Sequence, residues 1–393
     1  MKTNITLFAQ IAQLIPKQLF TKLSNQYQSY KYSKGLDSWT HLFSMLFCHF
    51  SGADSVRTIS LGLRSATGNL NHPGLKQSPK KSSISYLNKN RDWRLFKDFY
   101  FALYEHLSSI YNLKRPIHRR LKRKIFLLDA TIIPLCLSVF DWAQFRKRKG
   151  AIKLHTMLDY DGCLPVFMHL TEGKTHEIQV AKTMNIPSGS VLVADRAYVD
   201  FKWLKHLDSK NIYFVTRPKK NTKYDVFQPY QTGEESYNVE ILEDAKIGLM
   251  DEKSASDYSQ KLRLVRVWDK YNKRELTFLT NNFYWTALTV AELYRSRWEI
   301  EVFFKQLKQH LKIKTFVGTT PNAVLIQVWT AMITMLLLKF LKARAKYGWH
   351  LSNLITFVRL NLLVKVGLFE WLNNPFPQIQ NSSGSQLAIF DSG

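Results

Sequence analysis

Cysteine is scarce in this 393-residue chain, and acidic side chains are few beside the basic ones. Cys48, Cys136 and Cys163 lie far apart and form no CxxC pair, which excludes a disulfide framework and a cysteine-ligated zinc site and fits a reducing cytoplasm. The sequence has no internal repeat and no low-complexity tract. Its N-terminal apolar stretch is interrupted, which is poor material for a signal peptide.

A long hydrophobic run is also missing. The most apolar window, from Ala323 to Leu338, carries no charge but is only 16 residues long and ends at Lys339. A helix needs about 20 apolar residues to span a bilayer. We therefore expect a buried core helix at this place and no membrane partner.

Positive charge is what the chain has in excess. It carries 56 Lys and Arg against 30 Asp and Glu, a formal net charge of +26, and its 45% apolar residues are typical of a globular protein. Basic side chains that neutralise phosphates release counterions and so gain affinity. Nucleic acid is therefore the favoured partner, with an anionic membrane surface as the alternative. The basic run 114–124 fits either a solvated linker or a phosphate contact.

The order of the expected elements indicates several domains. Helical spacing of apolar residues dominates up to residue 112, and strands that alternate with helices follow from Ile125. The expected division is a helical domain over 1–112, an α/β core over 113–217 and 289–345, a β-rich insertion over 218–288, and a C-terminal helical segment with a flexible tail over 346–393.

Apolar runs and turn signals locate the strands within this division. We expect buried strands at 125–133, 190–195 and 212–217, a hairpin that turns at Asp161-Gly162, and a second hairpin around Tyr271-Asn272. Helical pattern resumes at Thr289 and continues to Arg344.

Two acidic residues stand in the buried strands. Asp129 lies within the first strand and Asp195 ends the second, so both acids could reach the same edge of a sheet. Taken alone, each could also be a strand-end acid that caps the following turn.

A third acid lies on a helix with a distinctive face. Thr289 and Glu292 have the spacing of a capping box, so we expect the helix to start at Thr289. At about 100° per residue, one arc of about 100° collects a carboxylate, basic groups and aromatic rings. Its members are Tyr294, Arg297, Trp298, Glu301, Lys305 and Lys308, whereas Glu299 falls outside the arc. An amphipathic surface helix with a Glu301–Lys305 ion pair is the alternative interpretation.

Together these residues suit phosphodiester chemistry. Two Mg²⁺ ions about 3.5–4 Å apart can stabilise the attacking and leaving oxygens of an in-line displacement. Carboxylates are the ligands that such hard cations prefer. Asp129, Asp195 and Glu301 would converge to hold the ions, while Arg297, Lys305 and Lys308 would hold phosphates.

The same residues resemble a known family. Tyr294, Arg297, Glu301 and Lys308 match, at the expected spacing, the YREK signature of the DDE transposases of the insertion-sequence-four family. Asp129-Ala-Thr resembles the first acidic block of that family, and Asp195-Arg-Ala-Tyr the second. Ala130 and Ala197 stand where the family often has Ser and Gly. The resemblance covers nearly the whole chain, up to residue 375.

The resemblance implies an α/β fold: a ribonuclease H-like catalytic core with a β-rich insertion domain and a helical N-terminal DNA-binding domain. It implies that Asp129, Asp195 and Glu301 are catalytic residues and ligands of two Mg²⁺ ions, which Mn²⁺ can replace. The DNA-binding residues expected with them are Tyr294, Arg297, Trp298, Lys305 and Lys308. If a hairpin intermediate forms, Trp285 and Trp268 are candidates to stack on a displaced base, although a place in the core is the simpler interpretation of either.

The implied function is cut-and-paste movement of an insertion sequence through its terminal inverted repeats. The implied partners are double-stranded DNA, both element ends and target, and a second copy of the chain in a homodimer on DNA. No small-molecule substrate is expected, and the expected place is the bacterial cytoplasm, at the nucleoid. A non-catalytic DNA-binding regulator or inactive relic is the alternative, and a structure-specific nuclease that cuts without joining is a third hypothesis.

Overall fold

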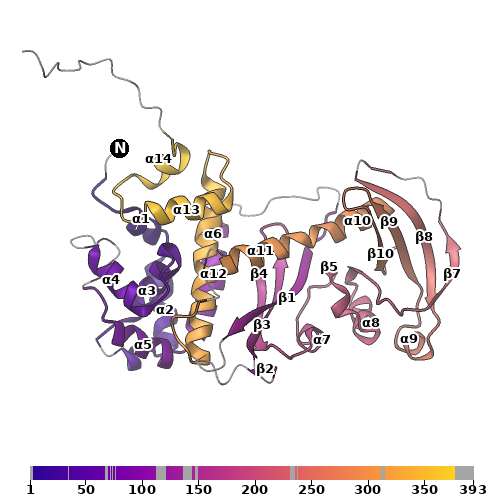
Figure 1. Cartoon of the computed structure of the whole chain (residues 1–393), viewed down its shortest axis with the longest axis horizontal. Helices are drawn as coiled ribbons and strands as arrows, with labels where there is room; N and C mark the ends of the chain where they lie inside the picture. Colours follow the sequence, from indigo (N-terminus) through magenta and orange to yellow (C-terminus); the bar gives the residue numbers. More distant parts are fainter. Residues whose placement is uncertain are drawn as a thin grey trace, which may run out of the picture.

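The computed structural model describes residues 3–33, 35–66, 70, 72, 74–75, 77–111, 121–135, 144–146, 149–230, 235–236, 238–309, 311 and 315–376. The molecule is elongated, with a helical bundle at one end and a twisted sheet that runs from the middle to the other end (Figure 1). Residues 114–120 of the basic run and 377–393 of the expected tail lie outside the described residues.

The helical end is built around α3 (Ser38–Ser51), almost all of which is buried. Asp37 caps its start by accepting a hydrogen bond from the Thr40 amide at 2.7 Å, and Gly52, at φ 72°, ends it in the left-handed conformation that glycine tolerates. Around it lie α1 (Leu7–Gln13), α2 (Lys17–Gln26), η1 (Ser29–Tyr32), α4 (Val56–Ser65), α5 (Lys81–Asn90) and α6 (Arg94–Ile110). The expected helical character of this part of the chain is confirmed.

Helices from the C-terminal part complete this bundle. These are α12 (Pro321–Arg344), α13 (Leu351–Leu360) and α14 (Leu368–Asn373), and α12 packs against α3, α5 and α6. Among the described helices, α12 has the length and apolar composition of a membrane span, but 89% of its most apolar window is buried inside the protein. The prediction of a buried core helix is therefore confirmed, although the helix is longer than its uncharged window.

The sheet has ten strands in the order β2-β3-β1-β5-β6-β10-β9-β8-β7, with β4 paired to β3. The strands are β1 (Ile125–Leu135), β2 (Gln144–Arg146), β3 (Lys149–Asp159), β4 (Leu164–Glu172), β5 (Val191–Ala194), β6 (Tyr213–Thr216), β7 (Tyr224–Pro229), β8 (Val239–Leu249), β9 (Leu262–Asp269) and β10 (Arg274–Thr280). β5 and β6 run parallel to β1, whereas β3 is antiparallel to β1 and β4 to β3. The three expected buried strands and both hairpins are confirmed.

The β-rich segment extends the same sheet and does not form a sheet of its own. β10 pairs with β6 through Leu279↔Thr216 and Thr280↔Val215, so β7 to β10 continue outward from the central strands. The open edge of β6 explains this, because unpaired backbone groups at a strand edge readily accept another strand.

Short helices connect and cover the strands: α7 (Glu177–Ala181), η2 (Arg196–Tyr198), α8 (Phe201–Ser209), α9 (Glu252–Asp257), α10 (Ala287–Ser296) and α11 (Trp298–Gln309). The helical pattern expected from Thr289 to Arg344 is confirmed, but it is divided among the separate helices α10, α11 and α12, so the projection of 294–308 on one unbroken helix was wrong. Between α10 and α11, hydrogen bonds that span three residues take the place of the four-residue bonds of an α-helix. The Arg297 amide donates to the Tyr294 carbonyl, and the Ile300 amide donates to the Arg297 carbonyl.

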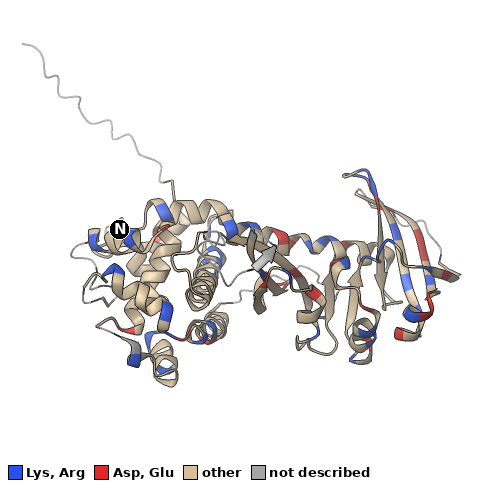
Figure 2. Cartoon of the chain, turned by 60° about the horizontal axis from the view of Figure 1, so that its bottom comes forward, with Lys and Arg blue, Asp and Glu red and all other residues tan. Residues whose placement is uncertain are grey.

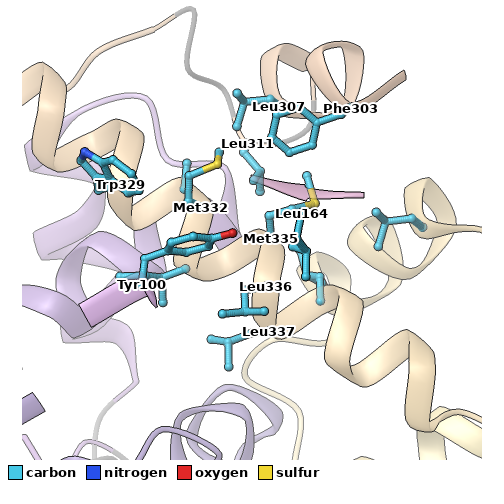
Figure 3. Packing of buried hydrophobic residues seen from close by; sticks show 14 of the residues in the cluster. Tyr100, Leu164, Phe303, Leu307, Leu311, Trp329, Met332, Met335, Leu336 and Leu337 are labelled. Atoms are coloured by element: carbon cyan, nitrogen blue, oxygen red, sulfur yellow. The ribbon is translucent and has the colours of Figure 1, made fainter. Parts of the chain in front are cut away.

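Helix α11 is anchored between the sheet and the bundle (Figure 3). Phe303 and Leu307 of α11 and Leu164 of β4 belong to the same buried cluster as Met332 and Met335 of α12. This packing fixes the angle and height at which α11 crosses β1.

Candidate active site

Asp129 and Asp195 occupy neighbouring strands at the same level. β1 and β5 are parallel, and their last paired residues are Leu128 and Ala194, so the next residue on each strand is an aspartate. Adjacent strands lie about 4.8 Å apart, which brings the two carboxylates to one edge of the sheet. Asp129 also accepts a 2.8 Å hydrogen bond from the Ala130 amide, which fixes its side chain near the backbone.

The third acid, Glu301, lies close to the junction between α10 and α11. α10 begins one turn earlier than expected, because Thr286 is the residue that caps it, accepting a 3.1 Å hydrogen bond from the Thr289 amide. The prediction that the helix starts at Thr289, made from the spacing of Thr289 to Glu292, was therefore wrong. Arg297 separates the two helices, and Glu301 lies in the first turn of α11.

Arg297 connects two of the three acids. Its Nη1 lies 3.1 Å from Asp129 Oδ2, and its Nη2 donates to Glu301 Oε1. The Arg297 side chain is only 17% exposed, so this is a largely buried ion triad in which charge-assisted bonds gain strength from the low local polarity.

Tyr294 connects the remaining acid to the same cluster. Its hydroxyl donates to Asp195 Oδ1 at 3.3 Å, and its ring packs on Phe278 with the centroids 4.8 Å apart. The Arg297 guanidinium carbon lies 5.7 Å from the Tyr294 ring centroid. Tyr294 thus binds Asp195, while the neighbouring Arg297 binds the other two carboxylates.

Burial dominates the electrostatics of this cluster. It raises the pKa of Asp129 to about 6, although the Arg297 guanidinium and the Ala130 amide oppose the shift. The pKa of Arg297 is raised in spite of its burial, because Tyr294, Asp129 and Glu301 surround it. Burial likewise raises the pKa of Tyr294, so the phenol remains a hydrogen-bond donor.

The other expected site residues lie along α11. Lys308 Nζ donates to Thr131 Oγ1 on β1 at 2.5 Å. Trp298 is 62% exposed, and Lys305 is exposed one turn after Glu301. Glu299, which the helical projection set apart, points toward the turn between β3 and β4, where its Oε2 lies 3.9 Å from Cys163 Sγ.

Thr131 is a residue that sequence reasoning missed. It lies two positions after Asp129 on the same strand, and residues two apart on a strand share a face, so the spacing could have identified it. Arg196 and Arg217 were missed as well. Both line a groove of about 1860 Å³ that also contains Asp195, Arg297 and Glu301.

The groove runs from the acidic cluster along α10 to the face of β8 to β10. Trp285 and the 90% exposed Tyr284 line it, whereas Trp268 is not among its lining residues. Of the two tryptophans considered for base stacking, only Trp285 therefore borders the groove, and its ring packs 5.4 Å from that of Tyr213.

The donor set suits a hard divalent cation, since it consists of carboxylates with no cysteine or histidine. Among the described residues, no three acidic, cysteine or histidine side chains are arranged to hold a metal ion as they stand. Of the three acids expected to converge on cations, Asp129 and Glu301 contact the Arg297 guanidinium, and Asp195 is bound by the Tyr294 hydroxyl. Arg297 is the cation in contact with Asp129 and Glu301 in this structure, and these carboxylates, with Asp195, would be the ligands of a bound metal ion.

Comparison with known proteins supplies the family. Residues 120–337 match the family described as the transposase DDE domain, and residues 3–76 match a domain of unknown function (DUF4372). The chain is 30% identical to a candidate transposase of Sinorhizobium fredii over 263 residues. These residues make up 67% of this chain and 71% of the relative.

Two further relatives carry insertion-sequence names. A candidate transposase for an insertion sequence element of Geobacillus stearothermophilus is 29% identical over 242 residues, 61% of this chain and 63% of the relative. A candidate transposase for an insertion sequence element of Synechocystis is 25% identical over 296 residues, 74% of this chain and 80% of the relative.

Proposed function

Because the chain belongs to the DDE transposase family, whose members cleave DNA and transfer its strands, we propose that it moves an insertion sequence by cut-and-paste. In this proposal it cuts at the terminal inverted repeats and joins the freed ends to target DNA. The observation that carries the residue assignment is the gathering of Asp129, Asp195 and Glu301 around Arg297 and Tyr294.

The three carboxylates would hold two Mg²⁺ ions, which Mn²⁺ can replace. Bound there, the ions would stabilise the charge that develops on the attacking and leaving oxygens of a phosphodiester. Tyr294 orients Asp195 by binding one of its oxygens and leaves the other available. The packing of α11 on the core keeps Glu301 at a fixed height above the sheet.

Basic and aromatic side chains beside the acids would hold the DNA end. Lys305 and Trp298 present exposed groups on α11, and Lys308 lies above β1 next to Thr131. Arg297, whose planar guanidinium matches two phosphate oxygens, would bind a phosphate if the carboxylates were neutralised by the ions. Arg196 and Arg217, which line the groove, extend this basic surface away from the scissile bond.

The finer assignments follow from the same residues. The spacing of Tyr294, Arg297, Glu301 and Lys308 supports the insertion-sequence-four group. We assign β4-β3-β1-β5-β6 to a ribonuclease H-like core, the strands of 218–288 to an insertion, and 1–112 to DNA binding. Pairing of two element ends implies a homodimer on DNA, and Trp285 is the tryptophan placed to stack on a base if a hairpin forms.

Joining of strands is the test of this function. The purified full-length chain is incubated with Mg²⁺, a duplex that ends in the inverted repeat flanking its gene, and a target plasmid. We expect cleavage at the repeat and covalent joining of its 3′ end to the plasmid. Cleavage without joining would make the protein a nuclease, and specific binding without cleavage would make it a regulator, so either result would contradict the proposal.

A further inference from the structure

Helices α4 and α5 lie in a part of the chain that has no acidic residue. Between Asp54 and Asp92 the sequence holds no Asp or Glu, and its basic residues are Arg57, Arg64, Lys76, Lys80, Lys81, Lys89 and Arg91. Arg91 is buried and donates to the Ser29 and Leu36 carbonyls, so it belongs to the scaffold. Basic segments also mark the outer helices of the bundle in Figure 2. A surface that carries only positive charge is complementary to a polyanion.

One face of α5 fastens it to the bundle. Ile84, Leu87 and Asn88 are buried, and Asn88 Oδ1 lies 2.7 Å from His41 Nε2 of α3. The Asn88 carbonyl also accepts a 2.9 Å hydrogen bond from Asn322 of α12. The backbone of α5 is therefore held rigidly on the two central helices of the bundle.

The opposite face of α5 is exposed and polar. Lys81, Ser82, Ser85 and Lys89 are all exposed, and at about 100° per residue they fall within one arc of about 100°. Two hydroxyl groups lie between two ammonium groups on this stripe. A helix about 10–12 Å wide fits the major groove of B-DNA, which is about 12 Å wide.

Two hydrogen bonds at Ser60 fix α4 beside the start of α5. The Ser60 hydroxyl donates to the Pro79 carbonyl at 2.7 Å, and the Ser78 hydroxyl donates to the Ser60 carbonyl at 3.1 Å. Arg57 and Arg64 lie about one turn before and after Ser60, and both are exposed. The connection 66–80 is much longer than the turn of a helix-turn-helix, which has about 3–4 residues. The two hydrogen bonds at Ser60 therefore hold the helices together where the connection is too long to do so.

We propose that α5 is the helix that reads the ends of the element. It enters the major groove, where Ser82 and Ser85 hydrogen-bond to base edges, while Lys81 and Lys89 bind the phosphates on either side. α4 crosses the adjacent backbone and binds phosphates through Arg57 and Arg64. This assignment rests on the proposed function, which requires a sequence-specific contact with the terminal repeat.

Duplex DNA fits this surface better than an anionic membrane does. A helix that inserts into a membrane interface needs a broad apolar face. Leu61 is the large apolar residue exposed on the two helices, both of which the structure describes in full. The hydroxyl groups of α5 can hydrogen-bond to base edges, which duplex DNA offers and a lipid surface does not.

The test is selection from a library of random duplexes by the full-length chain without divalent metal. Three double variants are compared with the parent: Ser82→Ala/Ser85→Ala, Lys81→Ala/Lys89→Ala, and the control Lys22→Ala/Lys31→Ala. The control removes two exposed charges from α2 and η1; α2 packs on α6 and α3, and η1 packs on α2. All six positions are exposed, so the variants should fold.

We expect the parent and the control to enrich the same motif. The serine variant should lose about tenfold or more of its preference for that motif over a scrambled duplex, with unchanged affinity for the scrambled one. The α5 lysine variant should bind both duplexes about tenfold more weakly, with the slope of log affinity against log salt reduced by about two.

Two results would overturn the assignment. One is that both α5 variants enrich the parental motif with parental affinity, and the other is that the parent enriches no motif. Mg²⁺-dependent cleavage of the duplex that ends in the inverted repeat is measured in parallel. Absence of this cleavage in the parent would refute the proposed function but not the assignment of α5, because the selection does not depend on cleavage.

Discussion

At the scale of single residues, Arg297 supplies the positive charge that the acidic cluster needs. Its two Nη atoms contact Asp129 and Glu301, while Tyr294 links Asp195 to the same group. Clustered carboxylates repel one another unless a cation lies between them. A guanidinium can fill that role with hydrogen bonds, and a divalent ion can fill it with a larger charge.

Replacement of Arg297 should therefore matter most when no metal is bound. Arg297→Ala leaves Asp129 without its ion-pair partner and should lower the free energy of unfolding by about 2 kcal/mol in EDTA. In millimolar Mg²⁺ the loss should shrink, because the bound ion replaces the missing charge. Urea unfolding of parent and variant in both buffers measures this difference. An identical loss with and without Mg²⁺ would mean that the metal and the guanidinium do not share a place.

The sequence located Asp129 inside a strand and Asp195 at a strand end, and both placements are confirmed. Periodicity was enough for this, since buried strands have a simple apolar pattern. The ion pair between Arg297 and Asp129 could not be predicted. It joins residues 168 positions apart and depends on how α11 crosses β1, which no local pattern records.

At the scale of elements, the break between α10 and α11 determines where the site residues point. A projection through an unbroken helix put Tyr294, Arg297 and Glu301 on one stripe. In the structure Tyr294 lies in the last turn of α10, Arg297 separates the two helices, and Glu301 lies in the first turn of α11. Tyr294 and Arg297 therefore reach different acids, Asp195 and Asp129. Single-sequence patterns do not show such a break, because both helices keep good helix formers through Arg297.

Helix α4 depends on a close approach to α3. A Cβ atom at Gly62 would lie 2.5 Å from the Phe47 ring, which is buried in the bundle. Gly62→Ala should therefore lower the free energy of unfolding by about 1–3 kcal/mol through overpacking. Gly348→Ala is the matched control, since nothing lies within 4 Å of its Cβ position. Thermal unfolding of both variants is the measurement, and equal stabilities would contradict the packing described for α4.

Helix α3 should make the bundle sensitive to acid. His49 is fully buried, with Nε2 3.0 Å from Thr330 Oγ1 and Nδ1 3.2 Å from the Leu311 carbonyl, and burial lowers its pKa from 6.5 to about 4. Between about pH 6.5 and pH 4, His49 therefore binds a proton in the unfolded chain but not in the folded one. The contribution of neutral His49 to the free energy of unfolding should be fully present above pH 6.5. It should decrease by up to about 3 kcal/mol as the pH drops to about 4.

His49→Gln isolates this contribution. The variant keeps a polar side chain that can reach Thr330 but cannot take up a proton, so its stability should change less between pH 7 and pH 4.5 than that of the parent. Urea unfolding at the two pH values gives the comparison. Parallel curves for parent and variant would show that His49 does not titrate in the unfolding reaction.

At the scale of the whole molecule, the net charge of +26 governs association with DNA. Several phosphate contacts should make the affinity for duplex DNA fall by about a thousandfold between about 50 and 200 mM salt. Filter binding or fluorescence anisotropy at several salt concentrations gives the slope. A flat dependence would leave the charge excess without a role in DNA binding.

The sequence predicted the mixed α/β class and the helical end, but not how distant segments combine. The C-terminal helices join the N-terminal bundle, and β7 to β10 continue the central sheet. Both features depend on contacts between residues far apart in the chain, such as His49 with Thr330 and Leu279 with Thr216, which composition and periodicity do not record. They also explain the elongated shape, in which β1, β5 and α11 lie between the bundle and the outer strands (Figure 1).

The most direct test of the central claim is a comparison of four single variants in Mg²⁺-dependent cleavage of the element end. Asp129→Asn, Asp195→Asn and Glu301→Gln each remove one carboxylate of the cluster, while Glu299→Gln removes the neighbouring carboxylate that faces Cys163. We predict that the first three lose at least about a thousandfold in cleavage rate while they still bind the end, and that Glu299→Gln cuts like the parent. Parental rates in any of the first three would contradict the assignment of one shared site.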